Sequence, residues 1–393
     1  MPAYQKAPFF DSTLNTGFTT TTGIGGTVTY GDPLGKPPRY QNWNFSIQRA
    51  LTSTMTVTAA FVGSNGKSLQ AGGAGNGRGI WSNQIDPRYL ALGNLLTQQA
   101  TPANITSAQA IISDVRLPYA NFQGTIGQML RPFPQYNAVG DPFGNVGQSN
   151  YNALQLSVIK TASNGLTLNA NYTLSKALAD TNGGRTAYSW QREKSLSNGD
   201  QTHVFNGLVV YELPFGKGRA IAPTNRAVSA IVSGWRVSGI TRLQSGIPLG
   251  TIAGACNAPL MGNCFTNYNS AFSGNVRING DWGDGDIRNT GTAPAYIDRT
   301  AFASPAAFTF GDTPPTGALG LRQPRMVNQD AGVRRDFQIR ENLRLGFQCD
   351  AFNIFNHVRF GGINTNITNA NFGKVTSQVN TPRVIQFALR IEF

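Results

Sequence analysis

Apolar and polar residues alternate with a period of two along much of the chain, and this pattern favours β-structure. Over residues 166–175, Leu166, Leu168, Ala170, Tyr172 and Leu174 occupy alternate positions between Thr, Asn and Ser. A strand points successive side chains to opposite faces, and a tilted strand of about ten residues is long enough to cross a membrane. The pattern recurs, with varying clarity, near residues 43–47, 55–61, 154–158, 203–213, 232–245, 331–337, 343–351 and 385–393. We therefore expect an all-β, antiparallel fold with about nine strands.

Composition excludes several other classes of protein. Only 13% of the 393 residues are charged and 45 are glycine, against about 25% charged in ordinary soluble domains. Aromatic and β-branched residues are too plentiful for disorder. Segments rich in Ala, Glu, Lys and Leu are nearly absent, which disfavours a helical soluble enzyme. The net charge is +13, but no run of four basic residues occurs, so we favour contact with lipid headgroups and expect no nucleic acid partner.

The connections between the expected strands alternate between short and long. Short turns fall near 51–54, 163–165 and 338–342, the link after Leu213 is of modest length, and long connections cover 63–149, 176–200, 246–328 and 356–382. The Asn164-Gly165 pair is typical of a type I′ hairpin turn. Outer-membrane barrels have short periplasmic turns and longer extracellular loops. The fold class that we predict is therefore a partial, antiparallel transmembrane outer-membrane β-barrel of about nine to ten strands.

Two groups of strand residues have candidate roles in such a barrel. The polar positions Asn169, Asn171, Arg344, Gln348 and Asp350 are candidates to face the lumen, although any barrel places polar residues against water or a plug. The final strand carries Phe387, Leu389, Ile391 and Phe393 at alternate positions. This ending is typical of the C-terminal signal that the barrel-assembly machinery binds, but an ordinary edge strand can also end in Phe.

Several segments, taken in order, resemble the C-terminal barrel part of TonB-dependent receptors, in particular the Oar-like, carboxypeptidase-regulatory-domain type of acidobacteria. These segments are QNWNFSIQR at 41–49, RPFPQY at 131–136, SNYNALQ at 149–155, YTLSK at 172–176, YELPFGKG at 211–218, GWRVSGI at 234–240, AFNIFNH at 351–357 and NFGK at 371–374. The resemblance implies that 40–393 is the C-terminal portion of a barrel of about 22 strands. Residues 1–39 would end an extracellular loop and possibly add one strand. The signal peptide and plug domain of such receptors have no counterpart in the sequence, so contact with the TonB complex would run only through the missing plug.

Other residues offer little chemistry. Cys256 and Cys264 are candidates for a loop disulfide, with two free thiols as the alternative, and Cys349 is most simply a small apolar residue. Asp281, Asp284 and Asp286 form a weak candidate for Ca²⁺, against a solvated loop, because the closing Glu of a calcium loop is absent. His203 and His357, the two histidines, belong to no catalytic motif. We expect no enzyme activity, no cofactor and no zinc site.

The leading hypothesis is part of a TonB-dependent importer of a large solute such as an oligosaccharide, peptide or metal chelate. Its arginine-containing outer loops would contact lipopolysaccharide, and it would reside in the Gram-negative outer membrane provided that an upstream signal peptide exists. One alternative is a small structural or adhesive barrel that a strand from residues 18–30 helps to close. Another is a secreted β-sandwich with carbohydrate-binding loops.

Overall fold

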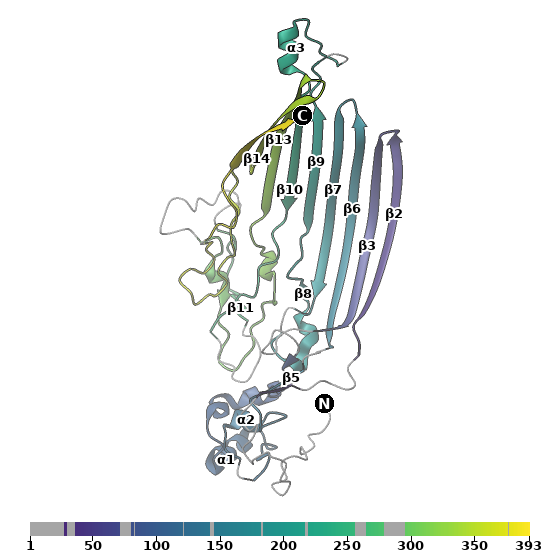
Figure 1. The fold of residues 1–393 in the computed structure, drawn as a ribbon. Coiled ribbons are helices and arrows are strands. Elements are labelled where there is room, and N and C mark those ends of the chain that lie inside the picture. Colours follow the sequence, from purple (N-terminus) through teal and green to yellow (C-terminus); the bar gives the residue numbers. More distant parts are fainter. Residues whose placement is uncertain are drawn as a thin grey trace.

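The computed structural model is dominated by one large antiparallel sheet (Figure 1). It describes residues 27–29, 36–70, 80–81, 83–120, 122–141, 145–181, 184–216, 219–255, 265–278, 295–375 and 377–393. The strands follow one another in the sheet in chain order: β2 (Arg39–Thr52), β3 (Met55–Leu69), β6 (Gly147–Ser163), β7 (Leu166–Ala179), β9 (His203–Glu212), β10 (Arg236–Gln244), β13 (Met326–Arg340), β14 (Leu343–Phe352) and β15 (Val384–Glu392). A short strand, β8 (Ser195–Leu196), pairs beside β7. All nine expected strands are confirmed, and β13 is longer than its sequence pattern indicates.

Local sequence explains the tight turns of this sheet. Asn164 and Gly165 join β6 to β7 with φ angles of 51° and 78°, the left-handed values that a type I′ turn requires. A Cβ on Gly165 would lie 2.8 Å from the carbonyl oxygen of Glu212 in β9. Glycine is therefore required at this position for both its backbone angle and its close contact.

Short and long connections lie at opposite ends of the sheet, as the connection lengths predict. In Figure 1 the hairpins β2–β3, β6–β7 and β13–β14 turn at one end, where the C-terminus also lies. The link from β9 to β10 at that end contains the helix α3 (Arg226–Val232). The other end carries the described residues of the β3–β6, β7–β9, β10–β13 and β14–β15 connections. We call these the turn end and the loop end.

The sheet is not closed. Its edges are β2 and β15, and every residue of both strands is exposed. Within the described residues, neither edge pairs with another strand on its outer side. No helix in the described part of the chain is long and apolar enough to cross a membrane.

A second, three-stranded sheet lies apart from the main one. It consists of β1 (Thr27–Thr29), β5 (Ala138–Asp141) and β4 (Ile80–Trp81), with β1 parallel to β5. The expectation that residues 18–30 supply a further strand of the main sheet is wrong for the described part of that range. The backbone of β1 pairs instead within the loop-end region.

The loops contain more regular structure than their sequences indicate. Their elements are η2 (Pro87–Thr97), α1 (Pro102–Ile111), α2 (Ile126–Met129), η3 (Ala187–Glu193), β11 (Asn267–Tyr268), η5 (Arg299–Ala301), β12 (Phe302–Ala303) and η6 (Ala318–Gly320). One apolar cluster, including Ile85, Leu96, Val115 and Ile126, joins η2, α1 and α2. A second, including Leu249, Ile297, Leu321 and Phe372, joins the loops before β13 and before β15. The long loop expected at 63–149 contains, in its described residues, the helices η2, α1 and α2 packed around the first of these clusters.

Candidate functional site

Strand pairing places the candidate lumen residues on a single face of the sheet. Directly paired residues of an antiparallel sheet lie on the same face. Gln348 pairs with Arg334 and Arg334 with Arg236, which pairs with Glu212. Asn206 lies six residues before Glu212 in β9, and therefore on the same face, and it pairs with Asn171 of β7. Asn169, Asn171, Arg344, Gln348 and Asp350 therefore share one face, which we call the polar face.

Side chains on the polar face hydrogen-bond to one another. Asn171 Nδ2 donates to Asn169 Oδ1 at 2.8 Å, and Gln348 Nε2 donates to Asp350 Oδ2 at 2.6 Å. Arg344 Nε donates to Gln338 Oε1 at 2.8 Å across the β13–β14 hairpin. The sequence pattern identifies the face but not these partners, which depend on register.

The opposite face is apolar and uncovered. Phe45 is 67% exposed, Phe387 68% and Leu389 71%, and Cys349 lies on this face as a free thiol. Soluble proteins rarely expose a continuous apolar surface of this kind, which instead marks a surface that contacts membrane or protein. We call it the apolar face.

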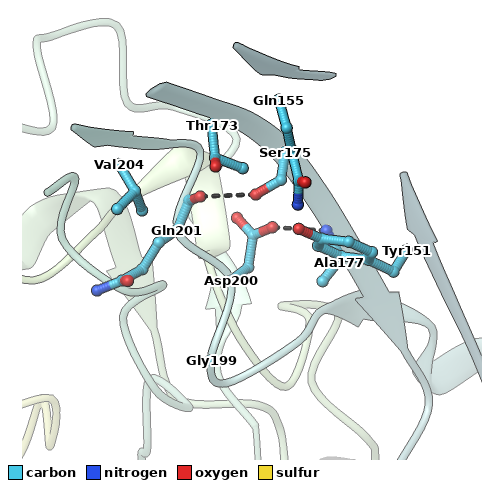
Figure 2. A pocket seen from close by; sticks show the side chains of 9 residues that line it. All are labelled: Tyr151, Gln155, Thr173, Ser175, Ala177, Gly199, Asp200, Gln201 and Val204. Atoms are coloured by element: carbon cyan, nitrogen blue, oxygen red, sulfur yellow. Dashed lines mark hydrogen bonds between the residues drawn. The ribbon is translucent and has the colours of Figure 1, made fainter. Parts of the chain in front are cut away.

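A cavity of about 240 Å³ opens at the loop end of β6, β7 and β9, and Figure 2 shows it from close by. Its lining consists of Tyr151, Gln155, Thr173, Ser175, Ala177, Gly199, Asp200, Gln201 and Val204. The loop before β9 is fixed over β7, because Ser175 Oγ donates to the carbonyl oxygen of Gln201 at 2.8 Å and Ala177 N donates to Asp200 Oδ1 at 2.6 Å. Tyr151, Gln155 and Thr173 belong to the polar-face set of their strands, so the cavity opens on the polar side.

A second cavity of about 320 Å³ adjoins the first and shares Gln201. Gln244, Ser245, Gln323 and Arg359 are among its lining residues. Amide and hydroxyl groups thus predominate among the polar side chains of the two cavities. Such groups donate and accept hydrogen bonds without carrying charge.

An ion pair lies between the two cavities. Arg322 donates to Asp200 Oδ2 at 2.6 Å and to the carbonyl oxygens of Asp200 and Gly246 at 3.1 and 3.0 Å. The Asp200 side chain is 1% exposed and the Arg322 side chain 20%. Asp200 is therefore committed to holding two loops together, and sequence analysis does not single it out.

A deeper ion pair lies within the β7–β9 loop, and its arginine also reaches the β10–β13 loop. Arg185 donates to Glu193 Oε2 at 2.6 Å, and the two side chains are 2% and 0% exposed. Arg185 Nε also donates to the carbonyl oxygen of Gly311 at 2.8 Å. Its guanidinium lies 4.1 Å from the ring centroid of Phe265. No local pattern in the sequence distinguishes these residues from other loop residues.

The family of the chain follows from its match to a model of the outer membrane beta barrel domain over residues 2–386. The chain belongs to this family. An outer membrane barrel domain resides in the outer membrane, where lipid covers the apolar face of its sheet. In that setting the turn end faces the periplasm and the loop end the exterior.

Solved structures of outer membrane receptors are similar to this barrel domain at a distance. The siderophore receptor PiuA from Acinetobacter baumannii is 10% identical with a TM-score of 0.37, over 89% of this chain and 28% of PiuA. Pyoverdine-bound FpvA from Pseudomonas aeruginosa PAO1 is 11% identical with a TM-score of 0.40, over 92% and 31%. The outer membrane transporter YddB from Escherichia coli gives 9% and 0.37, over 94% and 34%. The chain thus spans about a third or less of these proteins, and no curated protein matches it.

The remaining candidate residues are the loop cysteines, the loop aspartates and the histidines. Cys256, Cys264, Asp281, Asp284 and Asp286 lie outside the described residues. The Nδ1 atom of His203 lies 2.8 Å from the Tyr172 hydroxyl. Among the residues that the structure describes, no three His, Cys, Asp or Glu side chains form a group that could hold a metal ion. The disulfide and calcium hypotheses stay predictions.

Proposed function

We propose that this chain forms part of the wall and outer loops of a TonB-dependent importer for a large solute. The observation that carries the proposal is the open sheet, whose two edge strands are exposed along their whole length while its loop end carries folded loops. Bacterial single-chain barrels have an even number of strands and no edges. The nine strands of the main path are therefore best understood as one side of a wider barrel.

A wide barrel gives the polar face a role. Barrels of about 22 strands enclose a lumen that a plug occupies, and Asn169, Asn171, Arg344, Gln348 and Asp350 would line it. The motif resemblance supports the Oar-like subtype. Energy coupling would reach this wall only through a plug contacted by the TonB complex.

The solute would first meet the loop-end cavities. Their amide and hydroxyl groups suit a ligand with many hydrogen-bonding groups, such as an oligosaccharide, a peptide or a metal chelate. Import of this kind requires binding and a conformational change, so we expect no covalent chemistry from this chain. Arginines of the outer loops would contact lipopolysaccharide, and Ca²⁺ would be at most an accessory ligand at Asp281, Asp284 and Asp286.

The C-terminal strand supports assembly by the barrel-assembly machinery. Phe387, Leu389 and Ile391 line the apolar face of β15, and Phe393 is fully exposed at its end. These side chains would form the recognition signal before the strand is covered by lipid.

The experiment that tests the importer is the mass of the native polypeptide in the outer membrane, detected with an antibody against residues 246–328. A band well above 42.1 kDa, together with solute uptake that requires the TonB complex, would support it. A band at 42.1 kDa that shifts on heating would identify a complete small barrel, and the importer proposal would then be wrong. The described strand β1 does not favour that alternative, because it pairs with β5.

A further inference from the structure

The link between β9 and β10, residues 213–235, differs from the other connections at the turn end. The three hairpins there turn within a few residues, whereas this link contains α3 and stands beyond the strand ends (Figure 1). Asn225 begins the helix by accepting hydrogen bonds from the backbone of Ala227 and Val228 at 2.9 and 3.3 Å. The described part of the link therefore contains a capped helix at the turn end of the sheet.

The C-terminus of α3 is attached to the apolar face of the sheet. Arg335 of β13 donates to the carbonyl oxygens of Ala230 and Ile231. Trp235 Nε1 donates to the same Ile231 carbonyl at 2.8 Å. The register places Arg335 opposite Phe347, on the apolar face. The helix is thus held from the side of the sheet that lipid covers.

Aromatic rings complete this attachment. The Trp235 ring meets Phe337 and Phe347 edge to face, with centroids 6.4 and 6.0 Å apart. The Arg335 guanidinium lies 4.0 Å from the Phe337 centroid and 5.5 Å from that of Trp235. Trp and other aromatic residues are enriched where a membrane protein crosses from acyl chains to headgroups.

A position near the membrane interface explains how the Arg335 cation can lie on the lipid-facing side of the sheet. A charged side chain on that face is costly at the bilayer midplane and much less so near the interface. Arg335 is only 6% exposed, and the carbonyl groups at a helix C-terminus carry partial negative charge that favours a cation. The helix and the arginine therefore stabilise each other at the edge of the membrane.

The outer side of α3 is apolar and uncovered within the described structure. Val228 is 46% exposed and Ile231 67%. Arg219, which precedes the helix, pairs with Glu212 Oε2 at 2.5 Å. Exposed apolar residues on a helix beside a lipid-covered face are expected of a helix that lies in the plane of a membrane surface.

We propose that α3 lies in the inner leaflet of the outer membrane and binds phospholipid there. The apolar side chains of α3 enter the acyl-chain boundary, in continuity with the lipid-covered apolar face. Arg335 and Trp235 act as positioning residues that hold the helix at this depth. The inference rests on the outer-membrane location and not on import, so it stands or falls separately from the proposed function.

Photo-crosslinking in the native outer membrane tests the contact. A diazirine amino acid replaces Ile231 in the full chain, and a matched probe replaces Ile111, which is 54% exposed on α1 at the loop end. Mass spectrometry of the adducts should find phospholipid at position 231 and none at position 111. An adduct of position 231 with a protein, or lipid adducts no more abundant than at position 111, would overturn the proposal. Heat-shifted migration of each variant confirms that the barrel has folded.

A pair of arginine variants tests the positioning role. Arg335→Met removes the hydrogen bonds to α3, whereas Arg334→Met changes the neighbouring arginine on the polar face, which pairs with Asp336 at 3.3 Å. R335M should lower amide exchange protection in α3 at least about tenfold, because the helix loses two hydrogen bonds from a charged group to its C-terminal carbonyl oxygens. R334M should leave that protection unchanged. Equal protection in both variants, in vesicles of phosphatidylethanolamine and phosphatidylglycerol, would contradict the role of Arg335.

Discussion

The sheet exposes many of its apolar side chains, whereas the loops bury theirs. In the sheet, Phe387 and Leu389 are 68% and 71% exposed. In the loops, Leu249 and Leu321 are 0% exposed and belong to one cluster, and Ile85 and Ile126 are 0% exposed in the other. The wall therefore depends on lipid to cover its apolar face, whereas the loops contain protein cores of their own.

Polar groups follow the same division. The buried Arg185–Glu193 pair stabilises the loops. Arg185 and Glu193 belong to the β7–β9 loop, and Arg185 also donates to Gly311 of the β10–β13 loop. Ion pairs at the turn end, such as Glu212 with Arg219 and Arg236, are partly exposed. Burial increases the energetic consequence of losing a partner. Substitutions should therefore separate a loop region that is stable in water from a wall that is stable in lipid.

The largest effect is expected inside the loops. Arg185→Met leaves Glu193 buried without its cation, which costs about 3–5 kcal/mol. We expect faster proteolysis and amide exchange around 184–202 and 311–313, while the sheet keeps its heat-shifted migration in the outer membrane. Limited proteolysis followed by mass spectrometry measures this difference.

The control for that variant is an exposed ion pair in the same region. Arg88 and Asp114 are 2.8 Å apart, with side chains 54% and 39% exposed, and such pairs contribute about 0–1 kcal/mol. Arg88→Met should therefore leave the protease pattern unchanged. Simultaneous loss of the sheet in R185M would contradict the independence of the two regions.

Charge on an exposed apolar residue should distinguish lipid from water. Leu389, near the middle of β15, and Ile111, on α1, are both exposed, at 71% and 54%. Leu389→Arg should lose about 2–4 kcal/mol of folding free energy in a bilayer, whereas Ile111→Arg should change it by about 0.5 kcal/mol or less. Urea titration of the chain folded into vesicles gives both values. Equal losses would mean that lipid does not cover the apolar face at Leu389.

The sequence predicts the wall better than the loops for a physical reason. A strand of the wall has one polar and one apolar face, so Leu166, Leu168 and Ala170 carry the period of two on their own. The same alternation assigns Arg344 and Asn171 to one face before any register is known. The Asn164-Gly165 pair likewise fixes its turn locally.

The loops have no such local signal. Arg185 meets Gly311 and Thr313 only after two loops have packed together. The helix α1 begins with a Thr101 cap and Pro102, which are typical of a helix start. It buries only Ala108, however, and lacks the strong apolar stripe that would predict a helix from sequence. Contacts between distant segments, rather than periodicity, determine this part of the fold. The cavity residue Asp200 has no local sequence signal for the same reason, because its partner Arg322 comes from a distant loop.

The β6–β7 turn provides a smaller test that acts on the wall alone. Gly165→Ala forces a side chain into the left-handed region, at about 1–2 kcal/mol, and places its Cβ 2.8 Å from the Glu212 carbonyl oxygen. Gly199→Ala is the matched change in a loop, because an added Cβ meets nothing within 4 Å there. We expect G165A to fold into vesicles with a lower urea midpoint and G199A to match the unaltered chain. A lower midpoint for G199A instead would reverse the assignment of strain.

The smallest expected effect is a pH dependence at the junction between wall and loop. Asp180 directly follows β7 and is buried, and burial raises the pKa of its carboxyl above the ordinary value, although its hydrogen bond from Gln148 N at 2.5 Å acts in the opposite direction. The folded chain therefore holds this proton more tightly than the unfolded chain. Stability at the junction should be greatest below the ordinary carboxyl pKa and fall as the pH rises through the raised value, with a slope of at most about one proton.

The variant Asp180→Asn tests this dependence, because it keeps the acceptor for Gln148 and removes the titration. The exchange protection of the Gln148 amide should then no longer vary between pH 4 and 7. This range begins near the ordinary carboxyl pKa of about 4 and extends above it. Protection that falls with pH in both proteins would assign the dependence to another group.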